Sequence, residues 1–369
     1  MLSEMKKIGH EVLFLPTSPE NCRNGEGAFI RLKDGGILFA YTEFLKGLGH
    51  DSDVSRISGF VSYDEGETWT DKRVLLEPSE GALNVMSVSL LRRVDGSLAL
   101  IHGEKYEDKN GTITTRKLMK VSYDEGKTWS ENIRCYGRDG YSVSNNDRVT
   151  RLKSGRLIIP IAHHNDEKGL NPERGLKLNP GILTFSISDD DGKTWHTSDV
   201  MMRSPYSDPT GFQEPGVYQH EDGTLWLWCR TLLGSQFMSY SKDDGETWTN
   251  PEPSRFFTSP RSPMSVKKLG DHTVAVFNPI PTFTCRDPER GPWGRSPLVC
   301  AVSSNDGITH DAESFDKIFY LEDDLADSYC YTALFAGEDY FLAAYYHSNG
   351  SGWCLSNTKM IKVFFDELK

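Results

Sequence analysis

The chain has 369 residues, and its 41 basic and 53 acidic residues give a formal net charge of −12. It contains no lysine- or arginine-rich run and no basic amphipathic helix, which argues against nucleic acid or an anionic membrane as a partner. The N-terminal segment lacks the features of a secretion signal, and no stretch approaches the roughly 18 apolar residues of a membrane span, so we expect a cytoplasmic protein.

The seven cysteines are widely scattered and include no Cys-x-x-Cys pair. An odd number of scattered cysteines favours reduced, buried thiols over a disulfide framework. No cluster of histidines, cysteines and aspartates has convincing zinc spacing, so we expect no metal site.

One pattern recurs along the whole chain: alternating apolar residues, a turn of the Asp-Gly kind, and a β-rich run. Its copies span residues 27–43, 88–104, 147–164, 215–231, 264–279 and 332–348. Each copy is typical of a β-hairpin. Six regularly spaced hairpins without a helical pattern between them predict an all-β fold, a six-bladed β-propeller of four-stranded antiparallel blades that forms a single domain over residues 1–369.

A second motif, Ser-x-Asp-x-Gly-x-Thr-Trp, follows four of these hairpins. It reads SYDEGETW at 62–69, SYDEGKTW at 122–129, SDDDGKTW at 188–195 and SKDDGETW at 241–248, and a degenerate copy spans 303–310. The aspartate can accept backbone N–H groups of its own turn, the glycine can adopt positive φ, and the tryptophan can bury a large ring. The octet is therefore predicted to be the turn of the second hairpin of each blade.

Polar residues recur at a fixed distance from the first turn of successive blades. Counting nine residues back from the turn glycine gives Glu26, Ser87, Asn146 and Glu214. If the inner strands run in phase, these side chains ring one mouth of the central channel. Carboxylates gathered there would repel one another unless a ligand or cations compensate, which favours a binding site over simple caps of the strands.

The octets resemble the Asp-boxes of the sialidase (neuraminidase) superfamily, also called BNR repeats. The resemblance covers nearly the whole chain and implies that the boxes are structural and face away from the active site. It also implies the site residues. The family's glutamate, followed sixteen residues later by an arginine, falls on Glu214 and Arg230, a late arginine falls on Arg295, and the tyrosine of a Tyr-Ser-x-Leu motif falls on Tyr331 in YTAL.

The acid/base aspartate of the family lies about eleven residues before the first box. That position is Asp51, and Asp53 is the neighbouring candidate. The resemblance then implies retaining hydrolysis of a glycoside with a tyrosine nucleophile, without a cofactor. Glu214 would take the phenolic proton, Asp51 would protonate the leaving oxygen, and the two arginines would bind a substrate carboxylate.

The chain departs from the family at the first arginine. Gly25 stands where that arginine is expected, Arg23 is two residues away, and the late glutamate that supports the arginine is absent from AAYYHS at 343–348. We interpret the joint loss as a pocket adapted to another ligand and newly lined by Glu26, Arg148 and His163 or His164, with Asn146 and Asp53 nearby. Two alternatives stay open: Arg148 only pairs with Asp147 or a neighbouring blade, and Tyr331 only packs against other aromatic residues.

The leading prediction is a sialidase-like exo-glycoside hydrolase that acts on a small-molecule or oligosaccharide substrate with a terminal, acidic, sialic-acid-like sugar. A carbohydrate-binding propeller without catalysis is the alternative, motivated by the missing arginine. A scaffold that binds protein partners on its rim is a third, and a channel mouth filled by packed side chains would favour it.

Overall fold

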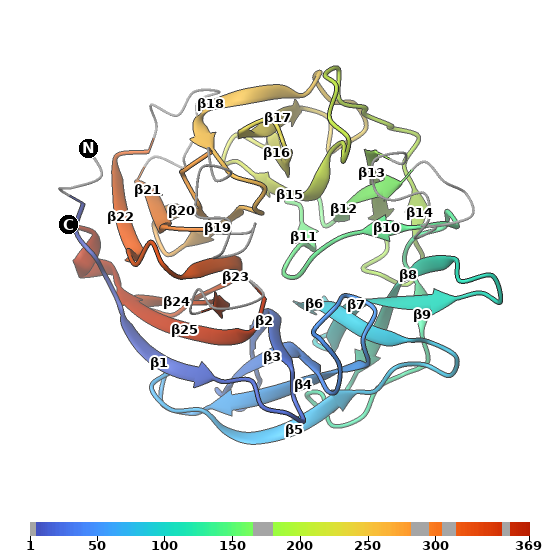
Figure 1. Ribbon diagram of the computed structural model, residues 1–369, viewed down its shortest axis with the longest axis horizontal. Coiled ribbons are helices and arrows are strands. Elements are labelled where there is room, and N and C mark those ends of the chain that lie inside the picture. Colours follow the sequence, from blue (N-terminus) through green and yellow to red (C-terminus); the bar gives the residue numbers. More distant parts are fainter. Residues whose placement is uncertain (1–4, 165–179, 282–294, 305–314, 349–354) are drawn as a thin grey trace.

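The computed structural model describes residues 5–164, 180–281, 295–304, 315–348 and 355–369. Six antiparallel sheets are arranged as blades around a common axis (Figure 1). The predicted all-β, six-bladed propeller is therefore confirmed. Among the described residues, no helix is long and apolar enough to cross a membrane.

The first three blades follow one another in chain order. From the axis outward, the first comprises β2 (Arg23–Arg31), β3 (Ile37–Phe44), β4 (Ser55–Ser62) and β5 (Thr70–Leu76). The second comprises β6 (Asn84–Arg92), β7 (Leu98–Glu107), β8 (Ile113–Ser122) and β9 (Ile133–Arg134). The third has an inner strand split into β10 (Ser142–Val143) and β11 (Thr150–Arg151), followed by β12 (Leu157–His164), β13 (Gly181–Ser188) and β14 (His196–Thr197).

The remaining blades complete the ring. The fourth comprises β15 (Gln213–Gln219), β16 (Leu225–Arg230), β17 (Ser235–Ser241) and β18 (Glu252–Thr258). The fifth comprises β19 (Ser265–Leu269), β20 (His272–Phe277), β21 (Leu298–Ser303) and β22 (Lys317–Glu322). The sixth comprises β23 (Ser328–Ala336), β24 (Tyr340–Ser348), β25 (Asn357–Phe364) and β1 (His10–Leu15), and the 3₁₀ helix η6 (Phe365–Leu368) follows β25.

The N-terminal strand closes the ring. β1 pairs antiparallel with β25, so the first strand of the chain is the outer strand of the last blade (Figure 1). The hairpin pattern does not predict this pairing because β1 lies outside every hairpin, and its partner is more than 340 residues away in the chain, as in the pair Leu13 and Met360. Closure covers a sheet edge that would otherwise be exposed.

The octets form the turns between the third and fourth strands, as predicted. In the first copy Asp64 accepts hydrogen bonds from the Ser62 hydroxyl at 2.8 Å and the Thr68 backbone N–H at 2.9 Å. Gly66 has φ +88° and its carbonyl accepts from the Trp69 indole at 3.1 Å. The aspartate contacts recur in the other strict copies.

Each octet tryptophan packs toward the preceding blade. The ring of Trp248 in the fourth blade stacks on Phe185 of the third, with centroids 4.7 Å apart, and Trp69 of the first blade packs with residues of the sixth. The octets therefore join neighbouring blades as well as closing their own hairpin. The degenerate copy lies mostly outside the described residues.

Antiparallel pairing fixes two opposite faces of the propeller. Turns between strands one and two, and the octet turns between strands three and four, lie at one end of each blade. Loops between strands two and three, and the connections from one blade to the next, lie at the other end. Asp51, in the loop between β3 and β4, therefore lies on the face opposite the octets.

Candidate active site

The inner strands carry bulges that aim side chains at the axis. Register shifts in β2, β6, β15 and β23 coincide with Glu26, Ser87, Glu214 and Tyr331, whose φ angles are +53°, +59°, +46° and +58°. A bulge redirects a side chain, and a non-glycine residue at positive φ costs about 1–3 kcal/mol, so such residues concentrate at functional sites. All four line a single pocket with a cavity of about 290 Å³.

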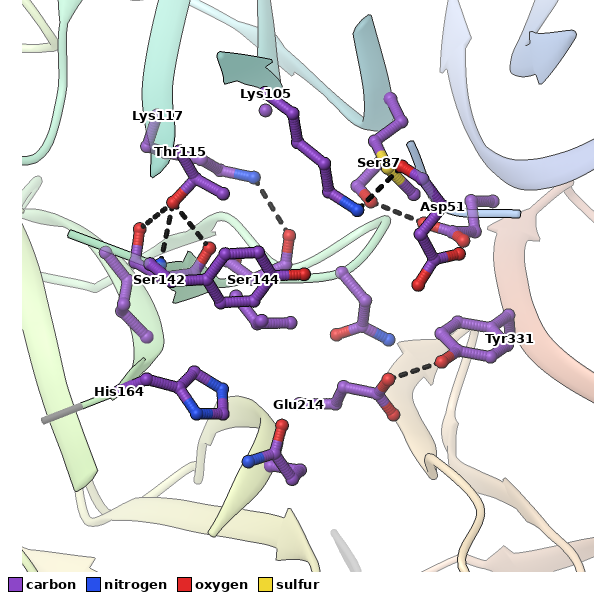
Figure 2. Close-up of a pocket in the computed structure, with 18 of the residues that line it drawn as sticks. Asp51, Ser87, Lys105, Thr115, Lys117, Ser142, Ser144, His164, Glu214 and Tyr331 are labelled. Carbon is purple, nitrogen blue, oxygen red and sulfur yellow. Dashed lines mark hydrogen bonds between the residues drawn. The ribbon is translucent and has the colours of Figure 1, made fainter. Parts of the chain in front are cut away.

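Tyr331 and Glu214 form the centre of the pocket. The Tyr331 phenol donates a short hydrogen bond to Glu214 Oε1, and Arg230 Nη1 lies 2.7 Å from Glu214 Oε2 (Figure 2). Burial, the negative charge of Glu214 and that of Glu26 hold the pKa of Tyr331 well above its usual range, whereas Arg230 and Arg295 oppose the shift. The phenol is therefore protonated at neutral pH, with a carboxylate placed to accept its proton.

Three arginines gather beside the phenol. Arg295 lies over the Tyr331 ring with its guanidinium 5.4 Å from the ring centroid, and its Nε donates to the Arg261 carbonyl at 3.1 Å. Arg261 also lines the pocket, and burial together with the charges of Arg230 and Arg295 lowers its pKa to about 10. Arginines crowded together in this way form a strong site for an anionic group such as a carboxylate.

Asp51 and Asp53 have different positions. Asp51 faces the pocket, and its Oδ1 lies 2.6 Å from Arg23 Nη1. Asp53 instead accepts hydrogen bonds from the backbone N–H groups of Leu48 and His50, both at 2.9 Å, and so shapes the loop that carries Asp51. Asp53 is not among the residues that line the pocket, so the structure supports Asp51 over Asp53 as the reactive candidate.

The two carboxyl groups that Arg23 holds differ in acidity. Burial favours the neutral form of Asp51, but the charges of Lys105 and Arg23 outweigh it and lower the pKa of Asp51 well below its usual range. The Asp51 side chain is 55% exposed because it faces the open pocket. Glu26 is 4% exposed, and burial raises its pKa in spite of Arg23, which lies 2.7 Å away.

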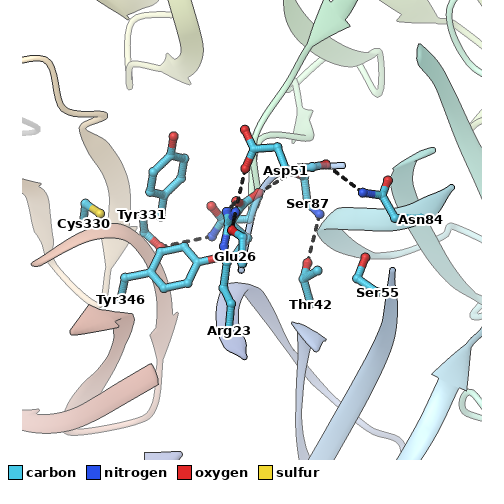
Figure 3. Close-up of polar contacts among 12 residues, drawn as sticks. Arg23, Glu26, Thr42, Asp51, Ser55, Asn84, Ser87, Cys330, Tyr331 and Tyr346 are labelled. Carbon is cyan, nitrogen blue, oxygen red and sulfur yellow. Dashed lines mark hydrogen bonds and ion pairs between the residues drawn. The ribbon is translucent and has the colours of Figure 1, made fainter. Parts of the chain in front are cut away.

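The place of the family's first arginine is filled by a tyrosine ring. A Cβ at Gly25 would lie 2.1 Å from Tyr346 Cε1, so no residue larger than glycine fits there without displacing the ring. Arg23 reaches the region from two residues earlier, fully buried, and its Nε donates to the Tyr346 hydroxyl at 2.8 Å (Figure 3). Tyr346 lies in AAYYHS, the segment in which the resemblance leads us to expect a late glutamate. The two positions at which the chain departs from the family, Gly25 and this segment, are therefore in contact with each other.

Besides Asp53, three predicted site residues do not line the pocket. Arg148 is 4% exposed and donates to the Met264 carbonyl at 2.7 Å, so it joins the third and fifth blades. Asn146 donates to the carbonyls of Gly27 and Tyr331 at 2.8 and 3.3 Å, beneath the bulges. Asn146, the third member of the predicted ring, leaves it because it falls in the break between β10 and β11, where positive φ shifts to Asp147.

His163 is the third. Its ring packs on Tyr136 with centroids 5.8 Å apart, and burial lowers its pKa to about 4, whereas His164 lines the pocket. Adjacent residues of a strand point to opposite faces, so only one of the two histidines can face the ligand. Of the two predicted histidines, His164 therefore faces the pocket and His163 faces the Tyr136 ring.

Several basic residues of the pocket were not predicted. Arg261 lies in the connection from β18 to β19, and Lys105 and Lys117 lie on β7 and β8. None has a fixed distance from an octet or a turn glycine. The sequence feature that could have indicated them is their position. Each is a basic residue near the end of an apolar strand or in a connection between blades, on the face opposite the octets.

Residues 56–347 match the model of a family described as a BNR repeat-like domain, and this span exceeds half of the chain. The chain belongs to this family. The match and the six-bladed fold confirm the predicted membership of the sialidase-like Asp-box propellers.

Solved structures share the fold of this BNR repeat-like protein. A protein of unknown function from Dyadobacter fermentans is 17% identical, with a TM-score of 0.73 over 96% of this chain and 98% of that one. The NanB sialidase from Streptococcus pneumoniae is 13% identical, with a TM-score of 0.72 over 98% of this chain and 71% of that one. The intramolecular trans-sialidase from Ruminococcus gnavus is 14% identical, with a TM-score of 0.71 over 98% of both chains. At identities this low, the structural similarity shows a common fold.

Proposed function

We propose that this protein is a retaining exo-glycoside hydrolase that removes a terminal acidic sugar, with Tyr331 as the nucleophile and Glu214 as its base. The observation that carries the proposal is the buried contact of the Tyr331 phenol with Glu214, whose other oxygen is held by Arg230. This arrangement joins a nucleophile, a base and a group that orients the base, which is the general signature of an activated nucleophile. The relatives named as sialidases support the reaction class.

The proposed reaction has two displacement steps. In the first, the Tyr331 oxygen bonds to the anomeric carbon, its proton passes to Glu214, and the bond to the leaving oxygen breaks as Asp51 protonates that oxygen. In the second, Asp51 takes a proton from water, whose oxygen bonds to the anomeric carbon. The tyrosyl oxygen leaves and recovers its proton from Glu214. A neutral phenol suits an anionic sugar because the sugar's own charge would repel a carboxylate nucleophile.

Asp51 requires the substrate in order to act as the acid. In the free protein Lys105 and Arg23 keep it ionised. An acidic sugar held by the arginines adds a negative charge to the same pocket, and a like charge raises the pKa of a carboxyl group. Asp51 is therefore protonated when the anionic ligand binds.

The ion pair between Arg23 and Asp51 also favours the second candidate, a carbohydrate-binding propeller without catalysis. Arg23 holds two carboxyl groups and the Tyr346 hydroxyl, and it is not among the residues that line the pocket. If Asp51 stays ionised in the complex, the ligand is bound and the leaving group is never protonated. The two functions therefore differ in turnover, with binding common to both.

The decisive experiment combines turnover with binding. Wild type, Tyr331→Phe and the control Tyr329→Phe, which changes a buried tyrosine of the same strand that does not line the pocket, are incubated with fluorogenic glycosides of sialic, ketodeoxynonulosonic, glucuronic and galacturonic acids. We expect turnover of at least one glycoside by wild type and the control, and a loss of roughly 10³-fold or more in Tyr331→Phe. Ligand-dependent thermal shifts without turnover by wild type would establish the binding protein instead.

A further inference from the structure

Two buried lysines form the wall of the pocket opposite the catalytic pair. Lys105 on β7 and Lys117 on β8 are 6% and 5% exposed and both line the pocket. Lys105 pairs with Thr115 and Lys117 with Gly103, so the two lysines are diagonal neighbours on one face of the sheet. Figure 2 shows them across the pocket from Glu214 and Tyr331.

Neither lysine forms a direct ion pair within the described part of the chain, and Asp51 and Glu26 act on Lys105 and Lys117 only through space. Among the described residues, no carboxylate oxygen lies within 4.0 Å of either ammonium group, and each donates one hydrogen bond to a main-chain carbonyl, Lys105 to Asp51 at 2.7 Å and Lys117 to Ser144 at 3.0 Å. An ammonium group has three donors, so both retain donors for a ligand. Burial lowers the pKa of Lys117 to about 8, which is the cost of a buried charge without a partner.

Unsatisfied polar groups lie next to the lysines. The Ser144 hydroxyl and both polar atoms of the Asn145 side chain are buried and have no hydrogen-bond partner within the described part of the chain. Both residues line the pocket, and they are 8% and 2% exposed. Buried polar groups are nearly always paired, so the unpaired atoms of two residues that line the cavity indicate a wall suited to a polar ligand.

We propose that this wall, formed by Lys105, Lys117, Ser144 and Asn145, is a second anion subsite that binds a sulfate or carboxylate group elsewhere on the substrate. The inference rests on the proposed function for the place of the terminal acidic sugar, which the cluster of Arg230, Arg261 and Arg295 holds. The carboxyl groups of Asp51 and Glu26 also line the pocket and are not bound to either lysine. The substrate is therefore an oligosaccharide with two anionic groups, such as a sulfated or uronate-rich glycan.

Binding of matched disaccharides tests this inference. Titration calorimetry is performed with glucuronyl-N-acetylgalactosamine, its 4-sulfated and 6-sulfated forms, and a glucuronyl-glucuronate disaccharide. We expect wild type to bind at least one dianionic disaccharide roughly tenfold or more tightly than the monoanionic parent, because a buried charged hydrogen bond contributes at least this factor. The sulfated and the diuronate ligands distinguish the two sources of the second charge.

Variants assign the preference to the lysines. In Lys117→Met and Lys105→Met, which nearly keep the length of the side chain and remove its charge, we expect the preference to fall to within about twofold. Affinity for the parent should be retained in Lys117→Met, because Lys117 does not contact Asp51. Lys120→Met is the matched control on β8, because Lys120 does not line the pocket. Equal affinity for all disaccharides, no binding of any, or a preference that survives in both lysine variants would overturn the subsite.

The same measurements separate this inference from the proposed function. A preference for dianionic ligands that depends on the lysines, in a protein that hydrolyses no glycoside, would support the second anion subsite and contradict the proposed hydrolase activity. Hydrolysis of monoanionic glycosides without any dianionic preference would do the reverse. Thermal unfolding of each variant shows whether it is folded.

Discussion

Arg23 is fully buried and holds Asp51 and Glu26 at the same time, at 2.6 and 2.7 Å. Removal of a partner from a buried ion pair leaves uncompensated charge and costs about 3–5 kcal/mol. For Arg23→Met we therefore expect a loss of this size in the free energy of unfolding at pH 7, measured by urea denaturation. Arg31→Met is the control on the same strand, because its ion pair with Glu65 is largely exposed and contributes about 1 kcal/mol or less.

The loss should depend on pH with a defined sign. Asp51 has a lowered pKa, so its contribution to stability is present above the pKa of the unfolded chain and disappears as pH falls. Glu26 has a raised pKa, so its protonated form, which is present at low pH, is the form that the folded protein favours. Without Arg23 both carboxyl groups favour protonation, so the destabilisation should shrink between pH 7 and pH 4. A loss that is the same at both pH values would contradict this account.

At the residue scale, sequence spacing predicted the positions that a strand bulge fixes. Glu26 and Glu214 share one offset from a turn because their blades repeat one backbone geometry, and Tyr331 occupies the same kind of bulge in the sixth blade. Spacing could not predict Arg261, Lys105 or Lys117, because these side chains reach the pocket from connections and from second and third strands. Their convergence depends on how the blades are placed around the axis.

Octet aspartates contribute to stability at the scale of a single hairpin. Asp190 accepts hydrogen bonds from the Thr194 N–H at 2.8 Å and from the hydroxyls of Thr194 and Ser188, at 2.6 and 2.9 Å. Burial opposes its ionisation, but these donors lower its pKa to about 2. We expect Asp190→Ala to lose about 1–2 kcal/mol of unfolding free energy at pH 7, since the site is open to solvent and hydrogen bonds to charged groups contribute little more.

The pH dependence identifies the cause. A lowered pKa means that the contribution of Asp190 is present above about pH 4 and fades as pH falls toward 2. The difference between wild type and Asp190→Ala should shrink over this range in chemical denaturation, while ligand binding at pH 7 is unchanged. The exposed Asp199 of the same blade provides the control variant Asp199→Ala. An equal loss in both variants would show that the octet carboxylate has no special role.

At the scale of the element, local sequence patterns predicted the hairpins and turns that short-range contacts form. Alternation and Asp-Gly turns predicted the hairpins, and the octets predicted their own turns, because both depend on residues within a few positions of each other. The first hairpin of the third blade has the same pattern over 147–164, but its inner strand is interrupted between Val143 and Thr150. The bulge there, with Asp147 in place of Asn146 at positive φ, depends on contacts across the axis that no local pattern records.

The whole molecule is held in a ring by β1. Its Val12, Leu13 and Leu15 pack with the core between the sixth and first blades, and each partly buried side chain contributes about 1 kcal/mol. A variant without residues 1–15 leaves β25 as an unpaired edge. We expect its unfolding temperature to fall by roughly 4 °C in calorimetry, because about 3 kcal/mol is lost.

A peptide supplied in trans tests whether the loss comes from the strand itself. A synthetic peptide of residues 5–16 can add to the free edge of β25 by main-chain pairing, and at saturation it should recover most of the lost stability, whereas a scrambled peptide should not. The sixth blade also carries Tyr331 on β23 and Tyr346 on β24. Loss of β1 should therefore weaken ligand binding at the pocket, and the peptide should restore it. An unchanged unfolding temperature would mean that ring closure adds nothing to the stability of the propeller.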